Sequence, residues 1–198
     1  MPGSLLWALV VFAFVTSVTP GPNNMMLLTS GVNFGFRRTI PHALGVAVGF
    51  TLMVALVGLG LAGIFKAAPV LLTVLKWVGA AYMLLLAVKL ARAAPLQEGG
   101  PMGRPMTFLQ AAAFQWVNPK AWIMALTASA TYTVPDAYVV SVLVVAAVFG
   151  GINLPTVSSW ILFGTALRRV LTNRSALRVF NWTMALLLVA SLYPALRD

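Results

Sequence analysis

The polar residues of this sequence that could act on a ligand gather at two short proline motifs. Residues 19–24 read Thr-Pro-Gly-Pro-Asn-Asn, and residues 118–120 read Asn-Pro-Lys. Asn side chains donate and accept hydrogen bonds, and a Lys ammonium group attracts anions such as a carboxylate. Proline lacks a backbone donor and disfavours helix in the residue before it. The motifs therefore predict two polar breaks suited to binding a small charged molecule.

The candidate binding residues lie at these breaks or one turn away. Gln115 precedes the second motif by one helical turn, and Asn153 lies in a third expected break at residues 150–155. Each Asn could instead only join two helices by hydrogen bonds, and this alternative stays open. The substrate-binding candidates are Pro20, Gly21, Pro22, Asn23, Asn24, Gln115, Asn118, Pro119, Lys120 and Asn153.

Two titratable residues are singled out by their positions in apolar segments. Lys120 lies about a dozen residues into such a segment, where a charge should face a cavity or a partner. A Lys that extends to the membrane interface is the alternative. His42 is the single His, and no acidic residue is available to orient it. It is the weak candidate for proton coupling, with a structural role as the alternative.

The scarcity of acidic residues argues against several kinds of chemistry. The three acids, Glu98, Asp136 and Asp198, fall in an expected linker, a turn and the last position. Divalent cations prefer anionic oxygen ligands, so we expect no metal site. No nucleophile, base and acid are set up for catalysis, and there is no cysteine. We expect no enzymatic activity and no cofactor.

The composition is that of a membrane protein. Hydrophobic residues make up 61% of the 198 residues and charged residues 8%, with a mean hydropathy of +0.95. Soluble domains carry about 25% charged residues. The net charge of +10 is interpreted as loop charge that orients the protein and contacts the lipid bilayer, with no nucleic acid as partner. The sequence therefore predicts an all-α polytopic membrane protein with a single membrane domain, residues 1–198.

Apolar segments of about 20 residues, enough for one crossing each, are expected six times. The linker at residues 93–106 separates repeat one (1–92) from repeat two (107–198), and each repeat opens with a helix broken at Pro beside Asn. An odd number of crossings inverts the second repeat relative to the first. We therefore predict six transmembrane helices as two inverted three-helix repeats, with the site between them. The segments are residues 4–28, 40–65, 70–91, 107–133, 137–167 and 177–196.

The distribution of basic residues predicts an orientation. Nine of the 13 Lys and Arg residues fall in or beside the loops at residues 29–39, 92–106 and 168–176. Basic loops stay in the cytoplasm, so both termini are predicted to be periplasmic. The first residues lack a positive region, so we expect an uncleaved first helix rather than a signal peptide. If that helix does not insert fully, the amino terminus would lie inside.

Gly45 and Gly49 form a Gly-x-x-x-Gly pair in the second segment. Small residues at this spacing let two membrane helices approach closely. The contact could lie within one protomer or between protomers, so a homo-oligomer stays open.

The motifs together resemble the LysE/RhtB family of amino-acid exporters across essentially the whole chain. The resemblance rests on residues 19–22, 35–37, 77–82 and 118–120. Many family members carry Asp where this chain has Asn23, and the Asn23-Asn24 pair resembles the branch with bacterial exporters of cysteine and O-acetylserine. The resemblance implies a bacterial inner-membrane secondary transporter that exports small amino acids or derivatives by alternating access, with proton antiport. The missing carboxylate argues against a dibasic substrate. A transporter or channel for another small solute or ion stays the alternative.

Overall fold

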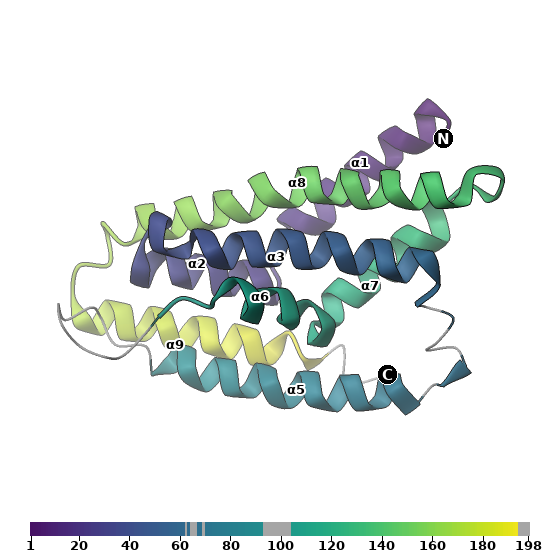
Figure 1. Ribbon diagram of the computed structural model, residues 1–198. Helices are drawn as coiled ribbons and strands as arrows, with labels where there is room; N and C mark the ends of the chain where they lie inside the picture. The colour runs from purple at the N-terminus through teal and green to yellow at the C-terminus, as the bar shows by residue number, and fades with distance from the viewer. Residues whose placement is uncertain (62, 64–66, 69, 93–103, 194–198) are drawn as a thin grey trace.

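A computed structural model describes residues 1–61, 63, 67–68, 70–92 and 104–193. Within these ranges every regular element is a helix (Figure 1). In this described part of the chain, three helices are long and apolar enough to cross a membrane, or four if the bent pair α1–α2 counts as one span. These findings confirm an all-α protein with several candidate membrane spans. The elements are α1 (Gly3–Val18), α2 (Pro22–Phe34), α3 (Phe36–Leu56), the π-helical turn η1 (Val57–Leu61), α5 (Val70–Ala91), α6 (Phe108–Phe114), the 3-10 turn η2 (Gln115–Val117), α7 (Pro119–Tyr132), the 3-10 turn η3 (Pro135–Ala137), α8 (Tyr138–Leu167) and α9 (Arg174–Ala190).

The break at the first proline motif is confirmed. Helix α1 ends at Val18, Thr19 and Gly21 are extended, and α2 begins at Pro22. The two helices are bent by 53° relative to each other. Pro22 occupies the first helical position, where its missing N–H removes no intrahelical bond.

The break at the second proline motif is also confirmed. Helix α6 starts with a capping box between Thr107 and Gln110 and passes into η2. Asn118 is extended, with φ −89° and ψ 110°, and α7 restarts at Pro119. The Asn118 side chain accepts a hydrogen bond from the Lys120 backbone N–H at 3.1 Å. Asn118 therefore caps α7 and satisfies one of the free donors of its first turn.

The expected break at residues 150–155 is wrong, because α8 runs without interruption from Tyr138 to Leu167 with Pro155 inside it. A single proline removes one backbone hydrogen bond, and membrane helices tolerate that loss; Pro155 itself is exposed on α8. Helix α8 packs against α1, α2 and α3. Gly150 serves this packing, since a Cβ there would lie 2.8 Å from the Thr51 hydroxyl oxygen.

The predicted loop at residues 29–39 is wrong as well. Helix α2 continues to Phe34 and α3 starts at Phe36, so Gly35 alone separates them. Gly35 has φ 80°, a conformation that glycine adopts without strain. The loop at residues 168–176 is shorter than predicted, because α9 begins at Arg174. Most of the linker at residues 92–106 and the end of the sixth segment (194–196) lie outside the described residues.

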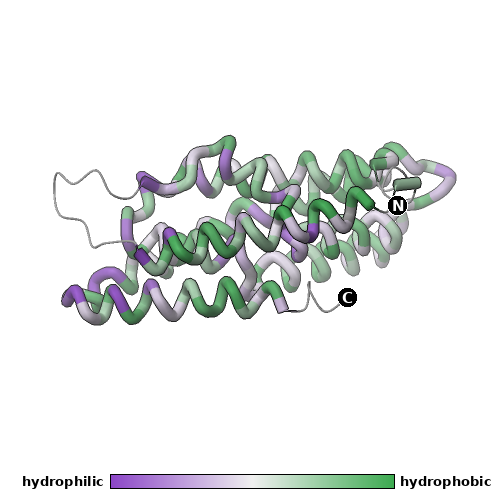
Figure 2. The backbone as a smooth tube through the Cα atoms, turned by 90° about the horizontal axis from the view of Figure 1, so that it is seen from below, coloured by the Kyte–Doolittle hydropathy of each residue, from purple (hydrophilic) through white to green (hydrophobic). Residues whose placement is uncertain are grey.

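Close helix contacts shape the middle of the bundle. Gly45 and Gly49 face α6, and a Cβ at either position would meet the backbone of Phe108 or Ala112. This glycine pair therefore packs inside the protomer. Hydrophobic residues follow most of the helical length, and hydrophilic ones gather at one end (Figure 2).

Candidate substrate site at the two helix breaks

Lys120 joins the two helix breaks. Its ammonium group donates to the Thr19 carbonyl at 2.8 Å, to the Thr19 hydroxyl at 2.9 Å and to the Pro20 carbonyl at 3.4 Å. These acceptors follow the carboxyl end of α1, where the helix dipole is negative and a cation is stabilised. The Lys120 stem crosses Gly21 so closely that a Cβ there would lie 2.7 Å from its Cδ.

The amide side chains near the first break hold the broken chain in place. Asn23 and Gln115 exchange hydrogen bonds of 2.8 and 3.2 Å between α2 and η2. Asn24 donates to the carbonyls of Ser17 and Thr19 at 2.8 and 2.9 Å. A broken membrane helix needs such partners for its freed backbone groups. These amide groups are thus already engaged within the protein.

A cavity opens where the breaks meet. The empty space in it is about 340 Å³ with the open mouth included. Among the described residues that line it, Lys120 is the single charged side chain. Phe50, Met124 and Val157 supply apolar walls. The complete lining is Thr16, Ser17, Gly21, Asn23, Asn24, Phe50, Asn118, Lys120, Ala121, Met124, Asn153 and Val157.

The structure brings most of the sequence-predicted candidates together. Gln115 lies behind Asn23 as its hydrogen-bond partner. Pro22 and Pro119 open helices α2 and α7, and Pro20 accepts a bond from Lys120. The candidates that line the cavity are Gly21, Asn23, Asn24, Asn118, Lys120 and Asn153.

His42 is not among the residues that line this cavity. It is 1% exposed in α3, and neither of its ring nitrogens has a hydrogen-bond partner. A role of His42 in coupling would therefore act from outside the binding cavity.

Sequence reasoning missed two polar lining residues, Thr16 and Ser17. The Ser17 side chain is 5% exposed, and its hydroxyl has no partner. The signal was a hydroxyl in the last turn of an apolar helix just before Pro20. Phe50, Met124 and Val157 gave no such signal, because apolar residues in a membrane segment look alike whether they face a cavity, another helix or lipid.

Two helix starts face the cavity. Gly21 and Asn23 mark the start of α2, and Asn118 and Ala121 mark that of α7. The first turn of a helix leaves N–H groups without intrahelical acceptors, and its dipole is positive. Together with Lys120, these ends can hold a carboxylate. Within the described ranges no three His, Cys, Asp or Glu residues cluster to bind a metal.

The sequence profile of the "LysE type translocator" family matches residues 14–191. The chain belongs to the LysE translocator family. Three relatives are named cysteine/O-acetylserine efflux protein, from Escherichia coli O9:H4 (strain HS), Escherichia coli (strain K12) and Shigella sonnei (strain Ss046); each is 35% identical over 196 residues, which cover 96% of both chains. No solved structure matches this LysE-family chain. Family membership and the apolar helices make it a multi-span membrane transporter, and they confirm the resemblance seen in the sequence.

Proposed function

We propose that this LysE-family protein is an inner-membrane secondary transporter that exports small neutral amino acids or their derivatives. One observation carries the proposal. A pocket lies where two broken helices meet, with one cation and no acid among its described lining residues. The names of the relatives point to the same class of substrate.

The substrate carboxylate binds between Lys120 and the amino-terminal ends of α2 and α7. Asn23, Asn24 and Asn118 hold these ends in position and offer their remaining polar capacity to the substrate. The apolar wall takes a short side chain. A dibasic amino acid is disfavoured, because its second cation would find no counter-charge in the pocket.

Six crossings as two inverted repeats fit the helix contacts. The broken helix of each half packs against the second helix of the other half: α1 and α2 on α8, and α6 and α7 on α3. Helices α3 and α8 pack together, as do α5 and α9, which is the pattern expected about a two-fold axis. The cavity lies at the boundary of the two halves, so rocking of one half against the other would give alternating access.

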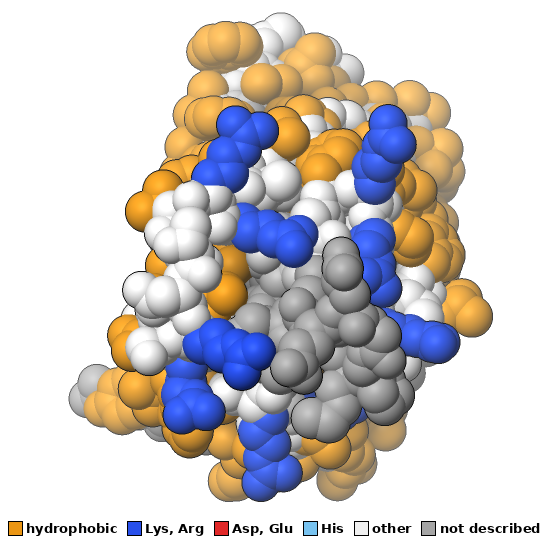
Figure 3. Space-filling model, turned by 90° about the vertical axis from the view of Figure 1, so that its left-hand side faces the viewer, with side chains coloured by type: hydrophobic (Ala, Val, Ile, Leu, Met, Phe, Trp, Pro, Cys, Tyr) orange, Lys and Arg blue, Asp and Glu red, His pale blue; other side chains and the backbone are white. Residues whose placement is uncertain are grey.

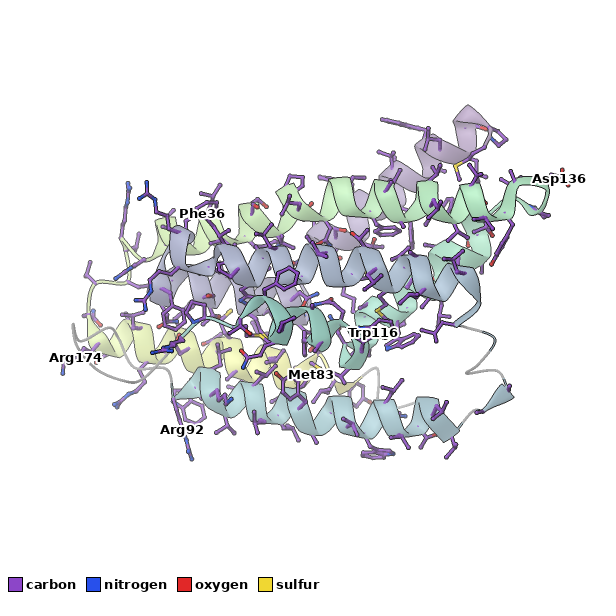
Figure 4. The ribbon with its side chains drawn as sticks, viewed as in Figure 1. Phe36, Met83, Arg92, Trp116, Asp136 and Arg174 are labelled. Carbon is purple, nitrogen blue, oxygen red and sulfur yellow. The ribbon has the colours of Figure 1, made fainter. Side chains whose placement is uncertain are left out.

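The charges support the proposed orientation. Lys and Arg side chains gather over one end of the molecule (Figure 3), and Figure 4 shows Arg92 and Arg174 at that end, opposite Asp136. We assign the basic end to the cytoplasm, with the termini on the periplasmic side.

Proton antiport is part of the proposal, with His42 as the candidate carrier. This assignment rests on its buried ring, whose two nitrogens are unpaired. In reconstituted vesicles, His42→Gln should retain counterflow of labelled amino acid while losing its response to a pH gradient. Equal pH responses of variant and wild type would remove His42 from the mechanism.

The function is tested with purified protein in proteoliposomes loaded with labelled neutral amino acids under an imposed pH gradient. We expect gradient-dependent flux of at least one small neutral amino acid. Lys120→Met should lower that flux at least about tenfold, because a charge-assisted contact to the carboxylate is lost. Lys89→Met, the same change at an exposed site, is the control. Absence of flux across the panel, or single-channel currents in planar bilayers, would overturn the proposal.

A further inference from the structure

The buried polar side chains of this protein are almost all hydrogen-bonded, and the exceptions are few. Among the described residues, the buried side-chain atoms without a partner are Ser17 Oγ, Asn153 Oδ1 and the two ring nitrogens of His42. Ser17 and Asn153 line the cavity, whereas His42 does not. Two unpaired oxygens therefore belong to residues of the same cavity wall. A buried polar group without a partner is unfavourable unless something else binds it.

The free hydroxyl of Ser17 departs from the local pattern. Thr16, the preceding residue, donates its hydroxyl to the Phe12 carbonyl at 2.6 Å. Thr156, three residues after Asn153 on α8, donates to the Ile152 carbonyl at 2.7 Å. This bond to the preceding turn is the usual way in which a helix satisfies Ser and Thr. Ser17 forgoes it, although it is 5% exposed.

Asn153 offers the second free oxygen. It is 6% exposed on α8, a helix that packs directly against α1, where Ser17 lies. The other amides around the cavity form hydrogen bonds: Asn23 bonds Gln115, Asn118 caps α7, and the Asn24 amide nitrogen donates to two carbonyls. Among the described lining residues, Ser17 Oγ and Asn153 Oδ1 are the buried side-chain oxygens without a partner.

We propose that Ser17 and Asn153 form the subsite that binds the α-ammonium group of the transported amino acid. This inference rests on the proposed function. An ammonium group carries three donors and no acceptor, so it pairs with oxygens such as Asn Oδ1 and Ser Oγ. The Lys120 ammonium repels it, which orients the carboxylate toward Lys120 and the amine toward the neutral oxygens. Because no acid is among the described residues that line the cavity, these oxygens take the place of a counter-charge.

The subsite defines the substrate class more narrowly than transport alone does. Substrates are molecules with a free α-amino group beside a carboxylate. An N-acetylated amino acid lacks two of the three donors and adds bulk, so it is excluded. A carboxylic acid without the amino group keeps the Lys120 contact and leaves both oxygens unpaired, so it binds weakly.

The experiment compares matched ligands on purified, detergent-solubilised protein by ligand-induced thermal stabilisation. The probes are glycine, L-alanine, L-serine, L-cysteine and O-acetyl-L-serine, each beside the corresponding acid without the amino group, and N-acetyl-L-serine. The variants are Ser17→Ala, Asn153→Leu and Asn153→Asp. Ser158→Ala is the control, because that hydroxyl bonds the Leu154 carbonyl on α8 and is outside the cavity lining.

Asn153→Leu should weaken binding of the preferred amino acid at least about tenfold and leave the matched acid within about twofold. Ser17→Ala should act in the same direction, and Asn153→Asp should retain binding because a carboxylate also accepts from ammonium. The subsite would be overturned if Asn153→Leu weakened binding of the amino acid and of the matched acid equally, or if N-acetyl-L-serine bound as tightly as L-serine. Neither outcome would affect the proposed loss of flux in Lys120→Met. If no probe stabilises the wild type, the proposed function fails together with it.

Discussion

At the scale of single residues, the contact between Gly21 and Lys120 sets the character of the site. The Lys120 stem occupies the space that a side chain at position 21 would fill. Gly21 itself is extended, with φ −173°, so its backbone would accept another residue without strain. The glycine is needed for space rather than for conformation.

Gly21→Ala should therefore displace Lys120 and reduce export while leaving the fold intact. We expect a loss of flux that approaches that of Lys120→Met, with a loss of unfolding free energy of about 1 to 3 kcal/mol, because the bonds of the Lys120 ammonium group to Thr19 are disturbed. Flux in proteoliposomes and thermal unfolding in detergent measure the two effects. Gly151→Ala is the control, because nothing lies within 4 Å of a Cβ there. Normal flux in Gly21→Ala would contradict the placement of Lys120.

Asn118 makes a separable contribution to stability as the cap of α7. Asn118→Ala should destabilise the protein by about 1 kcal/mol, because the Lys120 N–H loses its acceptor. Asn118→Ser supplies another capping oxygen and should recover most of that loss. Thermal unfolding of the three proteins is the measurement. Equal stability of Asn118→Ala and the wild type would show that the cap is unimportant.

The sequence was sufficient to identify the residues with unusual chemistry, but not their hydrogen-bond partners. Asn, Lys and Pro inside apolar segments are rare enough to be noticed, and Asn23, Asn118 and Lys120 do meet at one cavity. Their hydrogen-bond partners depend on tertiary packing, so the pairing of Asn23 with Gln115 had no local signal. The free hydroxyl of Ser17 is visible only once its missing partner is known.

At the scale of elements, the effect of proline on a helix differed from one site to another. Pro20 and Pro22 follow or flank Thr19, which accepts hydrogen bonds from Lys120 of the other half, and Pro119 follows the extended Asn118, which caps α7; the helix breaks at both places. Pro155 is exposed on α8, and there the helix continues. The local sequence shows the proline but not the contacts that differ between these sites.

Close packing of α8 on α2 yields a prediction at this scale. A Cβ at Gly164 would collide with the Leu28 carbonyl oxygen, which belongs to the backbone and cannot move aside. Gly164→Leu should therefore separate the helices and destabilise the protein by about 2 kcal/mol or more. Gly151→Leu, on the same helix but facing open space, should be tolerated. Comparable thermal stability of the two variants would contradict this packing.

At the scale of the whole molecule, the separation of charge predicts which end faces the cytoplasm. The natural chain has no cysteine, so single cysteines can be labelled without background. Asp136→Cys should react with a membrane-impermeant maleimide in intact spheroplasts. Arg174→Cys should react only after permeabilisation. The reverse pattern would invert the proposed orientation, and labelling of both from outside would contradict the six crossings.

Composition was sufficient to predict the class of this protein, because so few charged residues cannot cover a soluble fold of this length. Segment boundaries were less accurate. Helix α5 matches its predicted range of residues 70–91, whereas the turn between α2 and α3 shrank to Gly35. The predicted loop carried Arg37 and Arg38, but other polar residues of that range, including Thr39 and Asn33, are buried and hydrogen-bonded inside the bundle.

The single-residue joint at Gly35 has a mechanical consequence. Every residue from Pro22 to Leu56 except Gly35 is helical, so α2 and α3 behave as two rigid helices joined at a single residue. The other end of α2 adjoins the extended stretch at residues 19–21, where the pocket lies. Helix α2 has 13 residues and is therefore about 20 Å long. A change of tilt at its first turn would displace its other end, which lies toward the basic end of the molecule. A ligand bound at the first turn of α2 would therefore restrain the tilt of the whole helix.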